Sequence, residues 1–416
     1  MKTPPDTGAQ QEARCDRLLS FAVCFQISIV GVKNSLVQGI PELYNVNSTL
    51  NNVLLVIIAL VYIWAFLESW NRIEQINPSV CLFFLFLLLS FFCSYLFFPI
   101  NRSEIMNMLP RVVPYYFLTA YFITKLRTTQ WIVYYMTRFC YLNLLACLVT
   151  CVFIYIHGHV TTSPWLSYSL PMSYSCMLAT IWLLYRFFQR KKLSLLLAAA
   201  VGIVIIALFG SRNPLIGITT YIAVKSFKKV FGPDSTIYKK MGFVLLLLFV
   251  GLLLLYFREL LTLLNDVLLD VGVQSRTLKL MLESEMNMTG RSEIHSSLLQ
   301  VLSVNPLAGL GVGGDAAVLG ISSHSLYLSI LAIYGYIIGG LLIAALLYVC
   351  AATYFRADEK NREVLLIYYC LILPRGFFGG DVFSSDVFWW MLGLIVVSNC
   401  CSRKNRFQPN NALYGA

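Results

Sequence analysis

Charged residues are scarce in this chain: they make up 12% of its 416 residues, and only four residues are histidines. Hydrophobic residues make up 58%, above the ~45–50% that is usual in soluble domains. This composition excludes a water-soluble globular protein. Low-complexity tracts and internal repeats are missing as well, and we find no separate soluble domain.

Signals for export and for metal binding are also missing. Residues 1–17 are polar and the first apolar run lacks a small-residue cleavage site, so we expect no cleavable signal peptide. None of the twelve cysteines falls within residues 258–334, and no C-x-x-C pair with histidine partners occurs. We therefore predict no disulfides, no metal site and no cofactor.

Apolar runs long enough to cross the ~30 Å of membrane hydrocarbon recur along the whole chain. They predict an all-α integral membrane protein with about 12 transmembrane helices and one large helical loop between spans 9 and 10. The predicted spans are 18–38, 50–67, 79–98, 112–124, 131–156, 166–185, 193–209, 211–224, 241–257, 335–355, 364–380 and 385–400. The short spans 112–124 and 211–224 need extension by neighbouring turns, tilting or a re-entrant path.

Basic residues fix the expected orientation, because short cytoplasmic loops are enriched in lysine and arginine. Placing both termini in the cytoplasm puts most of the 31 basic residues on that side. The net charge of +11 then reflects membrane topology, and we expect no nucleic-acid partner. The loop at 258–334 falls on the outer side.

This outer loop, residues 258–334, is predicted to contain short helices. Leucines recur at three- and four-residue spacing in residues 258–283, which indicates an amphipathic helix lying in the membrane interface. A second helix is expected over 291–304, ended by Asn305-Pro306, because proline disfavours a helical residue before it. Arg291 and His295 lie four residues apart and therefore share a face of that helix.

Glycines punctuate the rest of the loop. Gly309, Gly311 and Gly314 match the pattern G-x-G-x-x-G, but no strand precedes them, so we interpret the run Gly309–Gly314 as a turn. A third helix is expected from His324 to Tyr334. Gly335 is predicted to break it before the tenth span.

Arginines at the outer membrane face are the first candidate site residues. Arg212 lies between two apolar runs, and Arg291 and Arg276 lie in the outer loop. An arginine near hydrocarbon is costly unless it meets an anion, and its planar donors suit phosphate oxygens. The alternative is a structural arginine paired with a carboxylate.

A histidine and a carboxylate complete the candidate set. His324 lies between serines at the start of a helix, where a neutral imidazole can accept a proton from a hydroxyl, although a lone histidine is more often structural. In PRGFFGGDVFSSD, Arg375 and Asp381 lie near the outer end of the eleventh span. Asp381 or Asp386 could orient a histidine or bind a sugar hydroxyl, or could pair with an arginine. His295 has a weaker case for either role.

The order of these motifs resembles the C-terminal domain shared by bacterial O-antigen ligases and Wzy-type polysaccharide polymerases. The matching residues are Ser211-Arg212, Thr289-Gly290-Arg291, the run Asn305–Gly311, and Ser323-His324-Ser325 followed by Leu328 and Gly335. The resemblance covers residues 193–355. It divides the chain into N-terminal spans at 1–192, a ligase- or polymerase-like core at 193–355, and two C-terminal spans with a tail at 356–416.

The resemblance implies a glycosyltransferase of the bacterial inner membrane. Proteins of this family transfer glycan from undecaprenyl diphosphate to an acceptor hydroxyl at the periplasmic face, without metal or nucleotide sugar. Arg212 and Arg291 would then bind the diphosphate, and His324 would be the general base. The family motif often has asparagine after the histidine, whereas Ser325 stands here, so Asp381 is our candidate for orienting His324.

The sequence leaves two acceptors possible for a glycosyltransferase, and it leaves one other class of protein as an alternative. A polymerase extends another lipid-linked glycan, whereas a ligase transfers to lipid A–core, and the short interval between Arg291 and His324 favours a polymerase. A polymerase would also imply a chain-length regulator as a partner, beside membrane lipids. A lipid-glycan transporter would also have many spans, but it would be expected to show inverted repeats, which we do not find.

Overall fold

The computed structural model consists of helices and connecting turns, without a strand among the residues that it describes. These are residues 8–73, 78–158, 170–209, 212–232, 236–238, 240–241, 256–270, 282, 291–304, 306–377, 379–383 and 385–406. The chain forms two compact units. Unit 1 comprises residues 1–27, 52–136 and 288–416, and unit 2 comprises residues 28–51 and 137–287.

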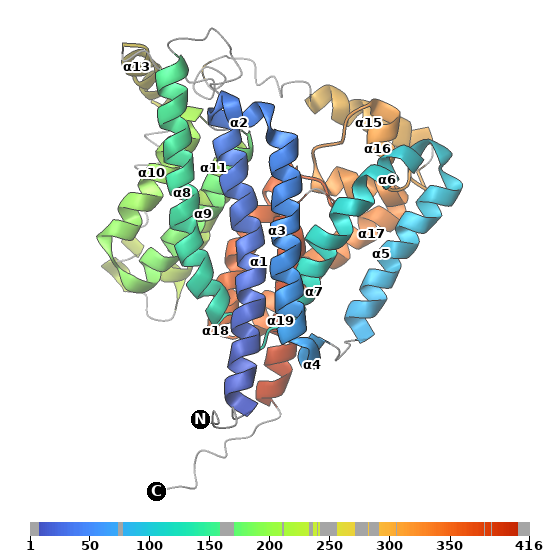
Figure 1. Cartoon of the computed structure of the whole chain (residues 1–416). Helices are drawn as coiled ribbons and strands as arrows, with labels where there is room; N and C mark the ends of the chain where they lie inside the picture. The colour runs from blue at the N-terminus through green and yellow to red at the C-terminus, as the bar shows by residue number, and fades with distance from the viewer. Residues whose placement is uncertain are drawn as a thin grey trace, which may run out of the picture. The chain divides into compact units, whose positions relative to one another are not determined.

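The helices are shown in Figure 1. In chain order they are α1 (Gly8–Gly39), α2 (Pro41–Asn45), α3 (Asn47–Glu68), α4 (Trp70–Ile73), α5 (Pro78–Phe97), η1 (Pro99–Asn101), α6 (Arg102–Arg111), η2 (Val112–Phe117), α7 (Leu118–Thr124), α8 (Gln130–Gly158), α9 (Leu170–Arg190), α10 (Leu193–Phe209), α11 (Arg212–Phe231), α13 (Phe257–Asp270), α15 (Arg291–Val304), α16 (Gly314–Leu319), α17 (Leu326–Arg356), α18 (Glu359–Ile372), η3 (Arg375–Phe377) and α19 (Asp386–Arg406). Of the short elements, η2 is a π-helix, and η1 and η3 are 3₁₀ helices.

Five of the described helices are long and apolar enough to cross a membrane. They are Gln11–Val37, Asn47–Glu68, Val80–Phe97, Gln130–Phe153 and Leu326–Arg356. On α5, the large apolar side chains of Leu82, Leu85 and Phe92 are exposed, as lipid-facing residues are. The chain is therefore an α-helical membrane protein, and the expected total of twelve spans stays a prediction. Every predicted span overlaps helical residues, although residues 242–255 of the predicted span 241–257 lie outside the described residues.

The core of unit 1 is formed where α19 packs against α7 and α18. The ring of Trp389 lies 4.9 Å from that of Phe117, measured between centroids, and Trp390 stacks on Tyr368. A side chain at Gly393 would approach the Cβ atom of Ile123 to 2.8 Å, so the absence of one lets α19 and α7 pack closely. Aromatic burial and one close helix crossing thus stabilise the C-terminal end of the chain.

The predicted short span 112–124 is part of a longer helical run, because α6, η2 and α7 follow one another without a break. Pro114 lies in the π-helical turn, and Pro110 lies one turn before it. Proline has no N–H to donate to the preceding turn and its ring crowds that turn, which favours local widening of the helix.

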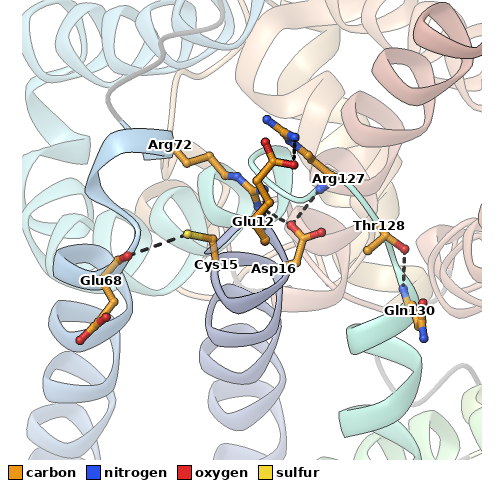
Figure 2. Close-up of polar contacts among 8 residues, drawn as sticks. All are labelled: Glu12, Cys15, Asp16, Glu68, Arg72, Arg127, Thr128 and Gln130. Atoms are coloured by element: carbon orange, nitrogen blue, oxygen red, sulfur yellow. Dashed lines mark hydrogen bonds and ion pairs between the residues drawn. The ribbon is translucent and has the colours of Figure 1, made fainter. Parts of the chain in front are cut away.

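Charged residues gather at one end of unit 1, beside the start of α1 (Figure 2). Asp16 of α1 pairs with Arg72 of α4 and accepts a hydrogen bond of 3.0 Å from the backbone N–H of Arg127. Glu12 pairs with the Arg127 side chain. These contacts join α1, α4 and the turn after α7. The start of α1 and the end of α19 lie at this end of unit 1, and α15 and α16 lie at the other (Figure 1).

Unit 2 contains a closely packed group of α9, α10 and α11. Gly202 of α10 lies so close to α9 that an added Cβ would meet the Thr180 hydroxyl at 2.2 Å. Separately, α13 provides the first part of the amphipathic helix expected over 258–283, and residues 271–281 lie outside the described residues.

Candidate active site

The glycine-rich loop, residues 306–313 before α16, packs against a break in α17. Gly335 has φ 76° and ψ 177° inside this helix, so the regular hydrogen bonds stop there, as the sequence predicted. The loop replaces them: Leu310 N–H donates to Ala332 O at 2.6 Å, and Tyr336 N–H donates to Pro306 O at 2.7 Å. Polar backbone atoms exposed by the break are thereby satisfied within the protein, as the membrane environment requires.

Residues of the preceding helices hold the same loop from the other side. The Asn101 amide at the end of η1 donates to Leu310 O at 2.7 Å. Ser94 of α5 accepts a 2.8 Å hydrogen bond from the Val312 backbone N–H. Beneath the loop, Leu298 and Leu302 of α15 form a small buried cluster with Leu310 and Ala332. The loop therefore connects α5, α15 and α17 of unit 1.

The helix expected from His324 begins two residues later, at Leu326, and His324 stands immediately before Ser325, which caps this helix, α17. Its φ of 49° lies in the left-handed region, which residues other than glycine rarely adopt. Ser325 caps the helix by accepting from the Leu328 backbone N–H at 3.3 Å. The imidazole is half-buried, with Nδ1 3.5 Å from the Ser322 hydroxyl. The histidine is therefore held at the start of an apolar helix in a strained backbone conformation.

The residues on both sides of His324 are fixed by hydrogen bonds. Asp315 Oδ2 accepts from the Ser323 N–H at 2.8 Å, and His295 Nε2 lies 3.1 Å from Ser323 O. On the other side, the Ser325 hydroxyl donates to Gly376 O at 2.9 Å. These bonds bring the start of α16, the middle of α15 and η3 to the short segment that carries the histidine.

Asp381 lies in the turn before α19 and is buried against α17. It accepts a 2.5 Å hydrogen bond from the Ser329 hydroxyl. Burial raises the pKa of the Asp381 carboxyl to about 6, and the charge of nearby Asp315 adds to the rise. Hydrogen bonds from Ser329 and from the backbone N–H groups of Val382 and Phe383 act in the opposite direction on this pKa.

The candidate arginines lie at element starts. Arg291 is the first residue of α15, one turn before His295, and Arg375 is the first residue of η3, next to Gly376. Arg212 begins α11 in unit 2. Arg276 lies outside the described residues. Unit 1 thus joins the elements that carry Arg291, His295, Arg375 and Asp381 to the segment that carries His324.

Sequence reasoning missed Asp315 and Ser329. Both are buried. Ser329 contacts a residue that is distant in the sequence, and Asp315 contacts a residue across a turn. The available signal for Asp315 was its place after Gly313-Gly314, where a buried carboxylate follows a tight turn. The role of Asp381 as the orienting partner of His324 stays a prediction, since its hydrogen-bond donor on α17 is Ser329.

The fold and these residues define a class of protein: an α-helical membrane protein with a buried polar segment at one end of one unit. No protein-family model, no curated protein and no solved structure matches this chain.

Proposed function

We propose that this chain is a membrane glycosyltransferase that transfers glycan from polyprenyl diphosphate to an acceptor sugar hydroxyl, and that it polymerises surface-polysaccharide repeat units. One observation carries the proposal. The segment Ser323–Ser329 around His324 is hydrogen-bonded to three elements that carry candidate residues. These elements are α15 with Arg291, η3 with Arg375, and the turn with Asp381.

The proposed chemistry uses His324 as a general base. Its imidazole takes the proton of the acceptor hydroxyl while the hydroxyl oxygen attacks the anomeric carbon of the donor glycan. The bond between that carbon and the diphosphate oxygen breaks, and polyprenyl diphosphate leaves with the bonding electrons. Arginine suits the leaving diphosphate because its charge persists at any physiological pH and its donors form paired hydrogen bonds.

Strain at the proposed base supports this assignment. A left-handed residue other than glycine persists only where its surroundings hold it, and such residues gather at functional sites. Around His324, hydrogen bonds with α15, α16 and η3 hold the neighbouring residues Ser323 and Ser325.

The test is the pattern of surface polysaccharide in a deletion strain complemented with wild type, His324→Ala or Arg291→Ala. We expect both variants to reproduce the deletion, with lipid A–core that carries a single repeat unit. Arg102→Ala is the matched control and should preserve polymer length, because the hydrogen bond and the cation–π contact of Arg102 are both with Tyr95, outside the candidate site. Immunoblots of membranes confirm equal amounts of protein.

Other outcomes separate the alternatives. Bare lipid A–core, with long chains retained on the lipid carrier, would identify a ligase. Accumulation of unpolymerised donor on the cytoplasmic side would favour a transporter. Full polymer length in both point variants would refute His324 and Arg291 as catalytic residues.

A further inference from the structure

His324 and Lys191 are the residues other than glycine that have left-handed backbones in the described part of the chain. Lys191 directly follows α9, where a left-handed residue is a common way to end a helix. His324 instead precedes a helix, where the chain is usually extended. The conformation of His324 therefore has no origin in ordinary helix capping, and the contacts around it must impose it.

Asp315 forms one of the hydrogen bonds that restrain this conformation. Asp315 has no other candidate role in the proposed reaction. Its two carboxylate oxygens bind two backbone N–H groups: Oδ1 accepts from Ala316 at 2.9 Å and Oδ2 accepts from Ser323 at 2.8 Å. The residue is 6% exposed. Its side chain thus closes the loop between the start of α16 and the residue before His324.

We propose that Asp315 is a positioning residue, which fixes Ser323 so that His324 keeps its left-handed backbone and presents its imidazole to the acceptor hydroxyl. This inference rests on the proposed function for its catalytic consequence, whereas the restraint itself concerns the folded protein alone. A carboxylate suits the role, because it accepts hydrogen bonds from backbone N–H groups at both oxygens.

Replacement by asparagine separates this role from simple packing. Asparagine has almost the same shape as aspartate but only one acceptor oxygen, so in Asp315→Asn the amide NH2 must face one of the two backbone donors. Asp315→Ala removes both hydrogen bonds. The matched control is Asp358→Ala, which removes a carboxylate that accepts the Asn361 backbone N–H at 2.9 Å at the start of α18.

The first measurement does not depend on activity. Purified full-length protein is treated with diethyl pyrocarbonate, and the rate of modification of His324 is followed by peptide mass spectrometry. We expect faster modification in both Asp315 variants, since the half-buried imidazole is released, and an unchanged rate in Asp358→Ala. Thermal unfolding is recorded for each variant. If Asp315→Ala does not accumulate, the shape-preserving Asp315→Asn provides the result.

The second measurement is turnover with a lipid-linked glycan donor. Displacement of a base by about 1 Å can lower a rate by ~10²-fold, so we expect Asp315→Asn to lower kcat by up to about that factor while the KM for the donor stays near its wild-type value. A modification rate that is the same as wild type in both Asp315 variants overturns the positioning role. Altered modification in a protein that shows no transfer, even as wild type, would keep the restraint and reject the proposed function.

Discussion

At the scale of single residues, the conformation of His324 has an energetic consequence. A Cβ atom on a left-handed residue crowds the following carbonyl oxygen and costs about 1–2 kcal/mol. His324 bears this cost at φ 49°. Glycine at this position would relieve the strain, whereas alanine would keep it.

We therefore expect His324→Gly to unfold at a higher temperature than His324→Ala, with a stability difference of about 1 kcal/mol after the greater unfolded-state freedom of glycine is included. Both variants should lose transfer activity. Lys191 provides the control, because its φ of 54° is similar and it lies outside the candidate site. Lys191→Gly should exceed Lys191→Ala in stability while both remain active. Equal unfolding temperatures for the two His324 variants would contradict the strain argument.

The carboxyl of Asp381 gives a dependence on pH. Its pKa is raised by burial from an ordinary 3.8 to about 6, so the folded protein binds this proton more tightly than the unfolded chain. The resulting stabilisation is complete below about pH 4 and is lost as pH rises through about 6. At ~1.4 kcal/mol per pKa unit, the loss amounts to about 3 kcal/mol.

Asp381→Asn imitates the protonated carboxyl and should remove this dependence. We expect the variant to exceed wild type in unfolding temperature at pH 7, and the difference to shrink toward pH 4. Asp358→Asn, at an exposed helix start, controls for the loss of a carboxylate in general. A difference between Asp381→Asn and wild type that is constant from pH 4 to pH 7 would show that Asp381 does not titrate in this window.

Several candidate site residues could be predicted from the sequence, but their hydrogen-bond partners could not. His324, Arg291 and Asp381 drew attention because each is polar within an apolar chain, a property that is visible in the sequence. Asp315 did not, because the role that we propose for it depends on its hydrogen bond to Ser323, which forms only after the chain turns at Gly320. Contacts of this kind depend on tertiary closure rather than on periodicity or local propensity.

At the scale of elements, signals that end helices predicted boundaries well. The helix expected over 291–304 is α15 with the same bounds, and the break expected at Gly335 is present. The short helix α16 was not predicted, and neither was the packing of the glycine-rich loop against the break in α17. The loop is held by backbone hydrogen bonds to Ala332 and Ile333, and a backbone contact leaves no trace in side-chain patterns.

The break in α17 should depend on Gly335. A Cβ atom there would meet the carbonyl oxygens of Pro306 and Leu307 at 2.6 Å, and φ is 76°. We expect Gly335→Ala to lose at least about 2 kcal/mol of stability, from strain and from displacement of the loop, and to expose the loop to proteases.

Gly340 on the same helix is the matched control, since an added Cβ would meet nothing within 4 Å. Gly340→Ala should be neutral or should gain about 0.5–1 kcal/mol, because alanine is the better helix former. The measurements are thermal unfolding and limited proteolysis of both variants. Similar unfolding temperatures and cleavage rates for Gly335→Ala and wild type would mean that the loop does not depend on the break.

At the scale of the whole molecule, three ion pairs mark one end of unit 1, which we call the charged end, and the candidate site lies at the opposite end. Arg14, Arg72 and Arg127 lie near the start of α1, where they pair with acidic residues. The glycine loop, α15 and α16 lie at the other end (Figure 1). Because basic residues favour the cytoplasmic side, the charged end should face the cytoplasm and the candidate site the opposite compartment.

Two cysteine substitutions test this orientation. Val318 on α16 and Thr128 in the turn before α8 are both exposed and belong to opposite ends of unit 1. With a membrane-impermeant maleimide, Val318→Cys should be labelled in cells whose outer membrane is permeabilised, and Thr128→Cys only after lysis of the inner membrane. The unsubstituted protein gives the background from its own exposed Cys81 and Cys93. The reverse pattern would invert the orientation and move the candidate site to the cytoplasm, where a periplasmic transferase could not act. Labelling of both positions before lysis would contradict a membrane crossing between them.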